Sequence, residues 1–326
     1  MQLTNVNSHK HLGITLKNDL PWNMHIQNLI QKGTKMINIL KGLQYSLQRT
    51  TLELIYFSYI RPLFEYGSVV WDGCTETNEQ ALERVQLEAA RVVTGALKST
   101  LIEKVYEETG WETLAKRREH QKLVLMYKIF NRLTPDYLYN VLPTVPEQTA
   151  YNMRPRNRFN IPPIPSDTVS FSRSFFPSTI KLWNALPVRT RNAENESDFK
   201  NILKRGVGLS PKQKSFYNFG DRYTNRIHAQ MRMGCTRLNV YLFKMKVVNS
   251  PICSCGRANE DILHFFLHCP NYTLQREELH RNILNYAPFT MATILYGCKT
   301  VSIDSNLNIA KLVHKYIRDT KRFLSR

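Results

Sequence analysis

Four side chains with metal-binding groups lie close together near the end of this chain, and they constrain its fold more than any other feature. Cys253 and Cys255 are separated by one residue, and His264 and Cys269 follow, so that all four fall within seventeen residues. Three thiolates and one imidazole form a ligand set that suits a closed, tetrahedral, structural Zn²⁺ site. The Cys-x-Cys spacing is shorter than usual, and we expect Gly256 to allow the turn that brings both sulfurs to one ion.

The alternative is that Cys253 and Cys255 are ordinary loop thiols and that His264 is a helical histidine without a ligand. The distribution of cysteines favours the metal site, because three of the six lie in this short stretch and the others are isolated. His268 is a competing ligand. It directly precedes Cys269, and neighbouring residues rarely both reach one ion in good geometry, so we favour His264.

The chain shows no sign of export or membrane insertion. It contains no apolar run of about 18 residues, the length that a transmembrane helix needs. Residues 1–17 lack the apolar segment of a secretory signal peptide. We therefore expect an intracellular protein, in the nucleus or the cytoplasm, without a membrane partner. Cysteines stay reduced in these compartments, which favours metal binding over disulfides.

Positive charge is concentrated in one third of the chain. The formal net charge is +19, from 45 Lys and Arg against 26 Asp and Glu. Residues 151–250 hold 18 of these cations and 5 of the anions, whereas residues 1–150 hold 17 and 15. Such a block is typical of a surface that binds the phosphates of nucleic acid. The alternative is a solvated face that keeps the protein soluble, although such a face usually mixes both signs.

The basic residues of this block are candidates for contacts with RNA or DNA. Arg154, Arg156 and Arg158 alternate with other residues, so an extended backbone would direct all three to one side. A flexible basic linker explains these three arginines equally well. The remaining candidates follow further along the chain: Lys212, Lys214, Arg222, Arg226, Arg232, Arg237, Lys244 and Lys246.

The hydrophobic pattern predicts a mainly α protein. Apolar residues recur at three- and four-residue intervals through residues 20–142, which predicts about six helices. Pro62 is expected to divide one of these helices, and Gly95 to end another. A short strand is expected over residues 12–16.

The second half of the chain begins with a change of composition. Seven prolines in residues 143–177 predict an extended linker. Helices are expected again from Ser178, which we predict as an N-cap. Asp221 is expected to cap a basic helix. A last amphipathic helix is expected over about 307–323.

Several short motifs occur in order along the chain: His11–Leu16, Leu20–Ile26, Tyr59–Tyr66, Glu83–Gln86, Gly110–Glu112, Ser174–Pro177 and Leu182–Pro187. Together with the Cys-Cys-His-Cys series, they resemble the end of the reverse transcriptase of non-LTR retrotransposons, the LINE-type or jockey-like elements. The resemblance covers nearly the whole chain, and the Cys-Cys-His-Cys (CCHC) series is its most specific part.

The resemblance implies a division of the chain into consecutive segments. In order, these are the end of the polymerase palm (1–20), a thumb-like helical domain (21–142), a proline-rich basic linker (143–177), a basic helical region (178–250), a CCHC zinc element (251–290) and a C-terminal amphipathic helix (291–326).

The same resemblance implies what these residues do not contain. Polymerases of this family hold two Mg²⁺ ions with palm carboxylates, including an adjacent Asp pair, because both ions must contact the reacting phosphate. This chain has no adjacent Asp pair, and Mg²⁺ would belong to the missing palm. We therefore expect a nucleic-acid-binding C-terminal fragment of an RNA-directed DNA polymerase, inactive alone. The alternatives are an active enzyme completed by upstream polymerase domains, or a decayed copy without a selected function.

Overall fold

The computed structural model describes residues 6–17, 22–143, 159–205 and 208–324. Most of these residues lie in helices, so the predicted mainly α class is confirmed. Among the helices of these residues, none combines the length and the apolar character that crossing a membrane requires.

The chain forms two compact units that are interleaved in sequence. The first unit comprises Met1–Lys35, Tyr59–Gln86 and Glu112–Val207, and the second comprises Met36–Ser58, Leu87–Trp111 and Gly208–Arg326. Two long helices, α1 (Asn23–Leu43) and α5 (Glu76–Thr94), contribute residues to both units. The residues of the predicted thumb-like domain, 21–142, are therefore shared between the units.

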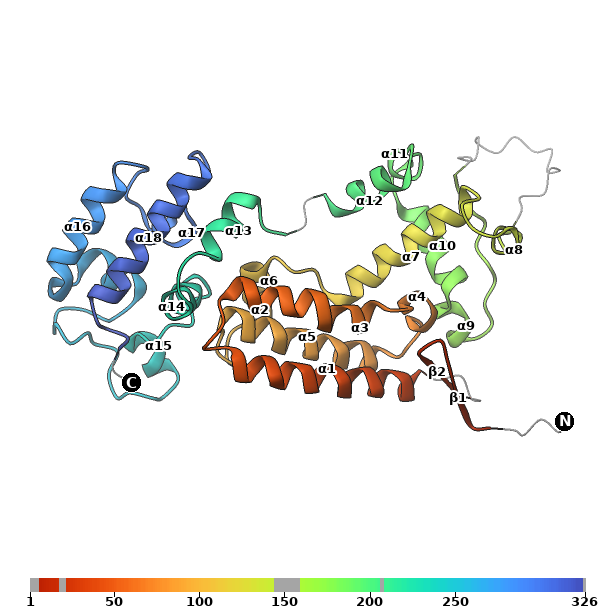
Figure 1. The fold of residues 1–326 in the computed structure, drawn as a ribbon, viewed down its shortest axis with the longest axis horizontal. Helices are drawn as coiled ribbons and strands as arrows, with labels where there is room; N and C mark the ends of the chain where they lie inside the picture. Colours follow the sequence, from red (N-terminus) through yellow and green to blue (C-terminus); the bar gives the residue numbers. More distant parts are fainter. Residues whose placement is uncertain (1–5, 18–21, 144–158, 206–207, 325–326) are drawn as a thin grey trace. The chain divides into compact units, whose positions relative to one another are not determined.

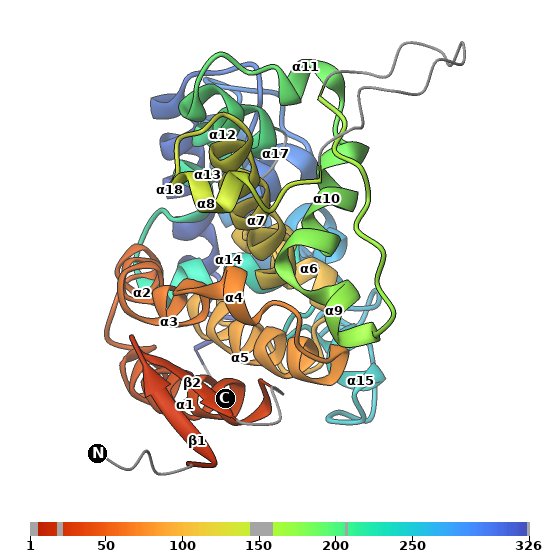
Figure 2. The same ribbon diagram turned by 90° about the vertical axis from the view of Figure 1, so that its right-hand side faces the viewer.

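A two-stranded hairpin opens the first unit (Figure 2). Strands β1 (Ser8–His11) and β2 (Ile14–Lys17) pair antiparallel, with His11 opposite Ile14. Leu12 and Gly13 form the turn, with φ of 45° and 86°, as two-residue hairpin turns prefer. The predicted strand over residues 12–16 was wrong at its start: Leu12 fits the alternating pattern but lies in the turn.

The other elements that lie wholly in the first unit are helices: α3 (Arg61–Glu65), α4 (Ser68–Trp71), α7 (Leu114–Phe130), α8 (Asp136–Tyr139), α9 (Val169–Arg173), α10 (Phe175–Ala185), α11 (Val188–Arg191) and α12 (Glu196–Lys204). Helix α7 packs against both α10 and α12. Tyr127 of α7, Trp183 of α10 and Phe199 of α12 are buried together, and the Tyr127 and Phe199 rings stack at 4.7 Å. This aromatic core fixes α12 against α7.

Prolines act differently at two helix starts. Pro62 was predicted to kink or divide its helix. It lies in the first turn of α3, and a π-helical turn (Tyr56–Ile60) separates α3 from α2. The prediction that Ser178 caps a helix was wrong, since α10 begins at Phe175 and Ser174 occupies the N-cap position. Pro177 lies in the first turn of α10, where backbone amides have no intrahelical acceptor and a missing N–H costs little.

The second unit also consists of helices and loops: α2 (Arg49–Ile55), α6 (Ile102–Thr109), α13 (Pro211–Tyr217), α14 (Arg222–Arg232), α15 (Asn239–Lys244), α16 (Thr273–Ile283), α17 (Met291–Tyr296) and α18 (Ile303–Asp319). Helix α18, blue in Figure 1, packs against α13, α14, α16 and α17. Its buried face includes Ile309, Val313 and Tyr316. The final helix is thus amphipathic as predicted, but it begins at Ile303 and ends at Asp319.

Candidate metal centre

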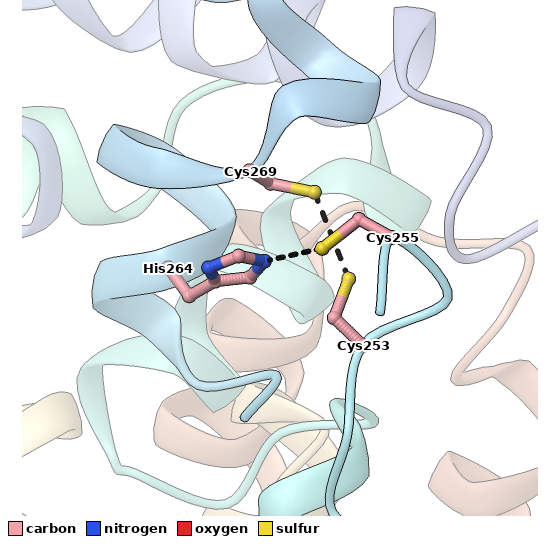
Figure 3. A group of neighbouring side chains, drawn as sticks. All are labelled: Cys253, Cys255, His264 and Cys269. Atoms are coloured by element: carbon pink, nitrogen blue, oxygen red, sulfur yellow. Dashed lines mark hydrogen bonds between the residues drawn. The ribbon is translucent and has the colours of Figure 1, made fainter. Parts of the chain in front are cut away.

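Four ligand atoms converge in the second unit (Figure 3). The sulfurs of Cys253, Cys255 and Cys269 and one ring nitrogen of His264 all lie within 4.8 Å of one another. The Sγ atoms of Cys253 and Cys269 are 3.6 Å apart, and Cys255 Sγ is 3.3 Å from His264 Nε2. The structure therefore brings together the whole set of ligands that the sequence predicted.

These separations suit coordination around one ion. Zn–S bonds of about 2.3 Å in a tetrahedral site place sulfurs about 3.8 Å apart and make sulfur–nitrogen separations slightly shorter. A disulfide would require sulfurs at about 2.0 Å, and all six cysteines are free. The cluster could therefore hold a metal ion at its centre.

A tight turn positions the first two cysteines. Ile252 and Asn259 form an isolated antiparallel bridge. Within it, the Cys253 amide donates to the Ala258 carbonyl at 2.9 Å, and the Gly256 amide donates to the Cys253 carbonyl at 2.9 Å. Gly256 has φ of 74°, a conformation that glycine adopts without steric cost. Gly256 therefore lies in the turn that brings the two sulfurs together.

The other two ligands lie at the start of and directly after a π-helical turn, His264–His268. The Cys269 amide donates to the His264 carbonyl at 2.8 Å, and the Asp261 carboxylate accepts from the His264 amide at 2.7 Å. Such wide turns are frequent at functional sites. The competing ligand His268 is exposed and lies outside the cluster.

Burial and backbone contacts act on the thiols in opposite directions. Cys253 and Cys269 are 3 % and 0 % exposed among aromatic rings of the core. Burial raises the pKa of Cys269 to about 12, because a buried thiolate loses its hydration. The Arg257 amide, which donates to Cys255 Sγ at 3.5 Å, lowers the pKa of Cys255. A bound cation would favour the thiolate at every sulfur.

A buried carboxylate adjoins the cluster. Glu260 lies with one oxygen 4.0 Å from Cys253 Sγ, accepts from the Asn239 amide at 2.8 Å, and accepts two bonds from the Arg322 guanidinium. Outer partners of this kind orient metal ligands. Glu260 and Arg322 were not predicted from the sequence, because they are 62 residues apart and no local pattern links them.

Two of the predicted nucleic-acid contacts are wrong. Arg222 and Arg232 are each only 7 % exposed. Arg222 donates to three backbone carbonyls, two of them in the last turn of α5. Arg232 donates twice to the buried Glu108 carboxylate. These guanidinium groups satisfy internal acceptors, so they stabilise the fold and cannot reach phosphate in solvent.

The remaining candidates differ in what they contact. Lys212 Nζ donates to the carbonyls of Lys299 and Val301 at 3.1 and 2.7 Å. The Arg226 guanidinium carbon lies 5.2 Å from the centre of the Tyr45 ring. Lysine and arginine side chains held in this way have less freedom to meet a ligand.

Three predicted lysines are exposed and Arg237 is partly buried. The exposed ones are Lys214 on α13, Lys244 at the end of α15 and Lys246 just after it. Arg154, Arg156 and Arg158 lie outside the residues that the structure describes. The exposed part of the predicted basic set is therefore smaller than the sequence suggested.

No protein-family model matches this sequence, and neither a curated protein nor a solved structure matches it. The cluster, the charges and the motifs are therefore the features that bear on function.

Proposed function

We propose that this chain is the nucleic-acid-binding C-terminal part of a non-LTR retrotransposon reverse transcriptase, and that its CCHC cluster holds a structural Zn²⁺ ion. The convergence of four ligand atoms in the order Cys, Cys, His, Cys carries the proposal. The ordered motifs that resemble this family support it. Because the sequence has no adjacent Asp pair, we assign RNA or DNA binding to these residues and no polymerase chemistry.

The donor set favours Zn²⁺ over other common ions. Three thiolates and an imidazole suit Zn²⁺, whereas Mg²⁺ and Ca²⁺ prefer oxygen ligands. Four protein ligands leave no open position for substrate, which is typical of a structural rather than a catalytic site. The ion would stabilise the loop between Ile252 and Asn259 against the turn that starts at His264.

Electrostatic contact with phosphates would come from the exposed lysines. Lys244 is the last residue of α15, and Lys246 follows two residues later. Lys246 adopts a left-handed backbone conformation (φ 57°) just after the helix. There the Lys246 amide donates to the Phe243 carbonyl and the Val247 amide to the Leu242 carbonyl. This hydrogen-bonded cap holds both lysines on a fixed backbone. Such contacts position a nucleic acid without reading its sequence.

The test combines metal analysis with a salt series of binding. We expect one zinc per purified chain, and binding to a labelled RNA hairpin or DNA duplex that weakens steeply as salt rises, because phosphate contacts release counterions. Lys244→Ala/Lys246→Ala should lower both the affinity and its salt dependence.

A matched control removes the same charge from lysines that already face carboxylates. Lys104 pairs with Glu107 at 2.7 Å, and Lys315 pairs with Glu278, so Lys104→Ala/Lys315→Ala should change binding much less. Zinc without any binding would refute the nucleic-acid function and leave the metal site standing. Absence of zinc would refute the metal site itself.

A further inference from the structure

A basic cavity of about 380 Å³ lies in the first unit. This volume is within the range of roughly 300–1,000 Å³ that is usual for small-molecule sites. Four cationic side chains line it, Arg117, Lys128, Lys200 and Lys204, together with the apolar side chains of Val124, Leu125 and Leu203. None of these residues was among the nucleic-acid contacts that the sequence predicted.

Two helices build the walls of the cavity. On α7, Arg117, Gln121, Val124 and Lys128 recur at three- and four-residue steps, so they share one face. On α12, Lys200, Leu203 and Lys204 do the same. Asn195 caps α12 by accepting from the Asp198 amide at 2.9 Å, and buried Phe199 anchors the helix on the core. The cations therefore project from a rigid frame.

The cationic side chains at the cavity outnumber the carboxylates that pair with them. Glu196 is shared by Lys128 and Lys200. Arg117 pairs with Glu65 and Glu112, and Glu65 also pairs with Arg61. Lys204 is exposed, and within the part of the chain that the structure covers it has no carboxylate partner.

The Glu196 pairs can be exchanged for a ligand. The side chains of Lys128, Lys200 and Glu196 are 36 %, 44 % and 29 % exposed. Ion pairs at such exposure contribute little to stability because water screens them. A phosphate group can therefore replace Glu196 as the partner of Lys200 at small cost.

Two uncharged groups complete the site. Gln121 accepts from the Ser68 hydroxyl through its amide oxygen, which leaves its NH₂ group to donate elsewhere. His120 Nδ1 lies 3.3 Å from Glu112 Oε1, and burial lowers the pKa of His120. His120 therefore adds a polar ring to the lining of the cavity.

We propose that this cavity binds one nucleotide of a single-stranded RNA or DNA. The phosphate lies on Lys200 and Lys204, and the sugar or base packs on Val124, Leu125 and Leu203. A duplex keeps its bases stacked inside, so only an unpaired nucleotide can enter. Phe, Tyr and Trp are absent from the residues that line the cavity, and its apolar side chains can pack on any base, so we expect weak base preference. This inference rests on the proposed function and adds a binding site to it.

The experiment measures how two double variants of the whole chain bind a labelled single strand. The strand has about 15 nucleotides, near the upper site size of single-strand binding modules. Lys200→Ala/Lys204→Ala removes the cavity charges. Lys116→Ala/Lys181→Ala removes two exposed lysines of the same unit that do not line the cavity. Circular dichroism confirms that both variants keep their helices.

The expected difference follows from counterion release. The cavity holds one phosphate, and losing that contact lowers the logarithmic salt slope by about 0.7 for a single strand. From about 50 to about 200 mM salt, the unmodified protein should then lose about 2.6-fold more affinity than the cavity variant. The control variant should keep the slope of the unmodified protein.

Equal slopes in the two variants would overturn the cavity assignment while leaving the proposed function intact. If the unmodified protein binds no nucleic acid, the proposed function fails. Hydrogen exchange with uridine monophosphate as the probe then decides the cavity separately. Protection of α7 and α12 that Lys200→Ala/Lys204→Ala abolishes would assign the cavity to free nucleotides, and absence of protection would overturn it.

Discussion

Glu108 holds two buried arginines together in the second unit. Its side chain is 2 % exposed, and those of Arg49 and Arg232 are 1 % and 2 % exposed. Arg232 donates to both carboxylate oxygens at 2.8 and 2.7 Å, and Arg49 donates to the carboxylate and to the Glu108 carbonyl at 2.7 Å. Glu53 lies 4.0 Å from Arg49, so the four side chains together carry no net charge.

Glu108→Gln keeps the size of the side chain but leaves one buried positive charge without compensation. It also turns an amide NH₂ towards guanidinium donors. Breaking a buried ion pair from one side costs about 3–5 kcal/mol. Arg49 Nε and Arg232 Nη1 already have no hydrogen-bond acceptor among the described residues, so the cluster has no acceptor to spare. We expect a loss of about 3 kcal/mol or more, out of the roughly 5–15 kcal/mol that stabilises a typical domain.

Urea unfolding and amide hydrogen exchange in α6 and α14 measure this loss. Glu108→Gln should speed exchange in both helices. Adding Arg232→Met restores the charge balance, so the double variant should be more stable than the sum of the single effects, with a coupling of about 0.5–3 kcal/mol. A loss below about 1 kcal/mol in Glu108→Gln, or strictly additive effects in the double variant, would refute the argument that charge balance holds this cluster together.

Three further predictions concern the second unit. First, burial lowers the pKa of His314 to about 4. The unfolded chain therefore takes up this proton at higher pH than the folded one, and stability should fall by up to about 3 kcal/mol as pH drops from about 6.5 to about 4. His314→Gln should flatten the decline between about pH 7 and 5 in thermal melts, and an unchanged decline contradicts the assignment. Second, Gly110 has φ of 65°, and an added Cβ would lie 2.7 Å from the Leu209 amide nitrogen, so Gly110→Ala should cost more than about 1 kcal/mol. Gly42→Ala meets no atom within 4 Å in helix α1 and should stabilise by up to about 1 kcal/mol; a reversed order in urea unfolding refutes the steric argument. Third, Cys255→Ser should release zinc and expose residues 250–275 to protease while leaving α7 protected, and retained stoichiometric zinc would show that Cys255 is not a ligand.

Features encoded by neighbouring residues could be predicted from the sequence. The four metal ligands lie within seventeen residues, so their spacing and one glycine turn almost suffice to define the cluster. Asp221 was expected to cap a helix, and it does so by accepting from the Thr224 amide at 3.0 Å. Each of these features depends on contacts within a few turns of backbone, where side-chain type and spacing decide the outcome.

Features that depend on distant partners could not be predicted. Arg222 and Arg226 are four residues apart on α14, and the sequence treats them alike. Arg222 is buried because the final carbonyls of α5, 129 and 130 residues earlier, need donors. Likewise, nothing local reveals that α1 and α5 each contribute to two compact units. Tertiary packing decides such cases after local preference has fixed the helices.

Charge counted along a chain is therefore a poor measure of charge on a surface. The block of residues 151–250 carries a large excess of cations, yet Arg222 donates to backbone carbonyls and Arg232 pairs with a carboxylate inside the fold. Conversely, the cavity of the first unit draws Arg117 and Lys128 from the nearly balanced half of the sequence. A helix face brings together residues that are three and four positions apart, whatever the composition of the surrounding sequence. An excess of cationic side chains can therefore arise where two such faces meet. Binding should accordingly follow the exposed lysines of α12 and α15, not the total charge of the segment.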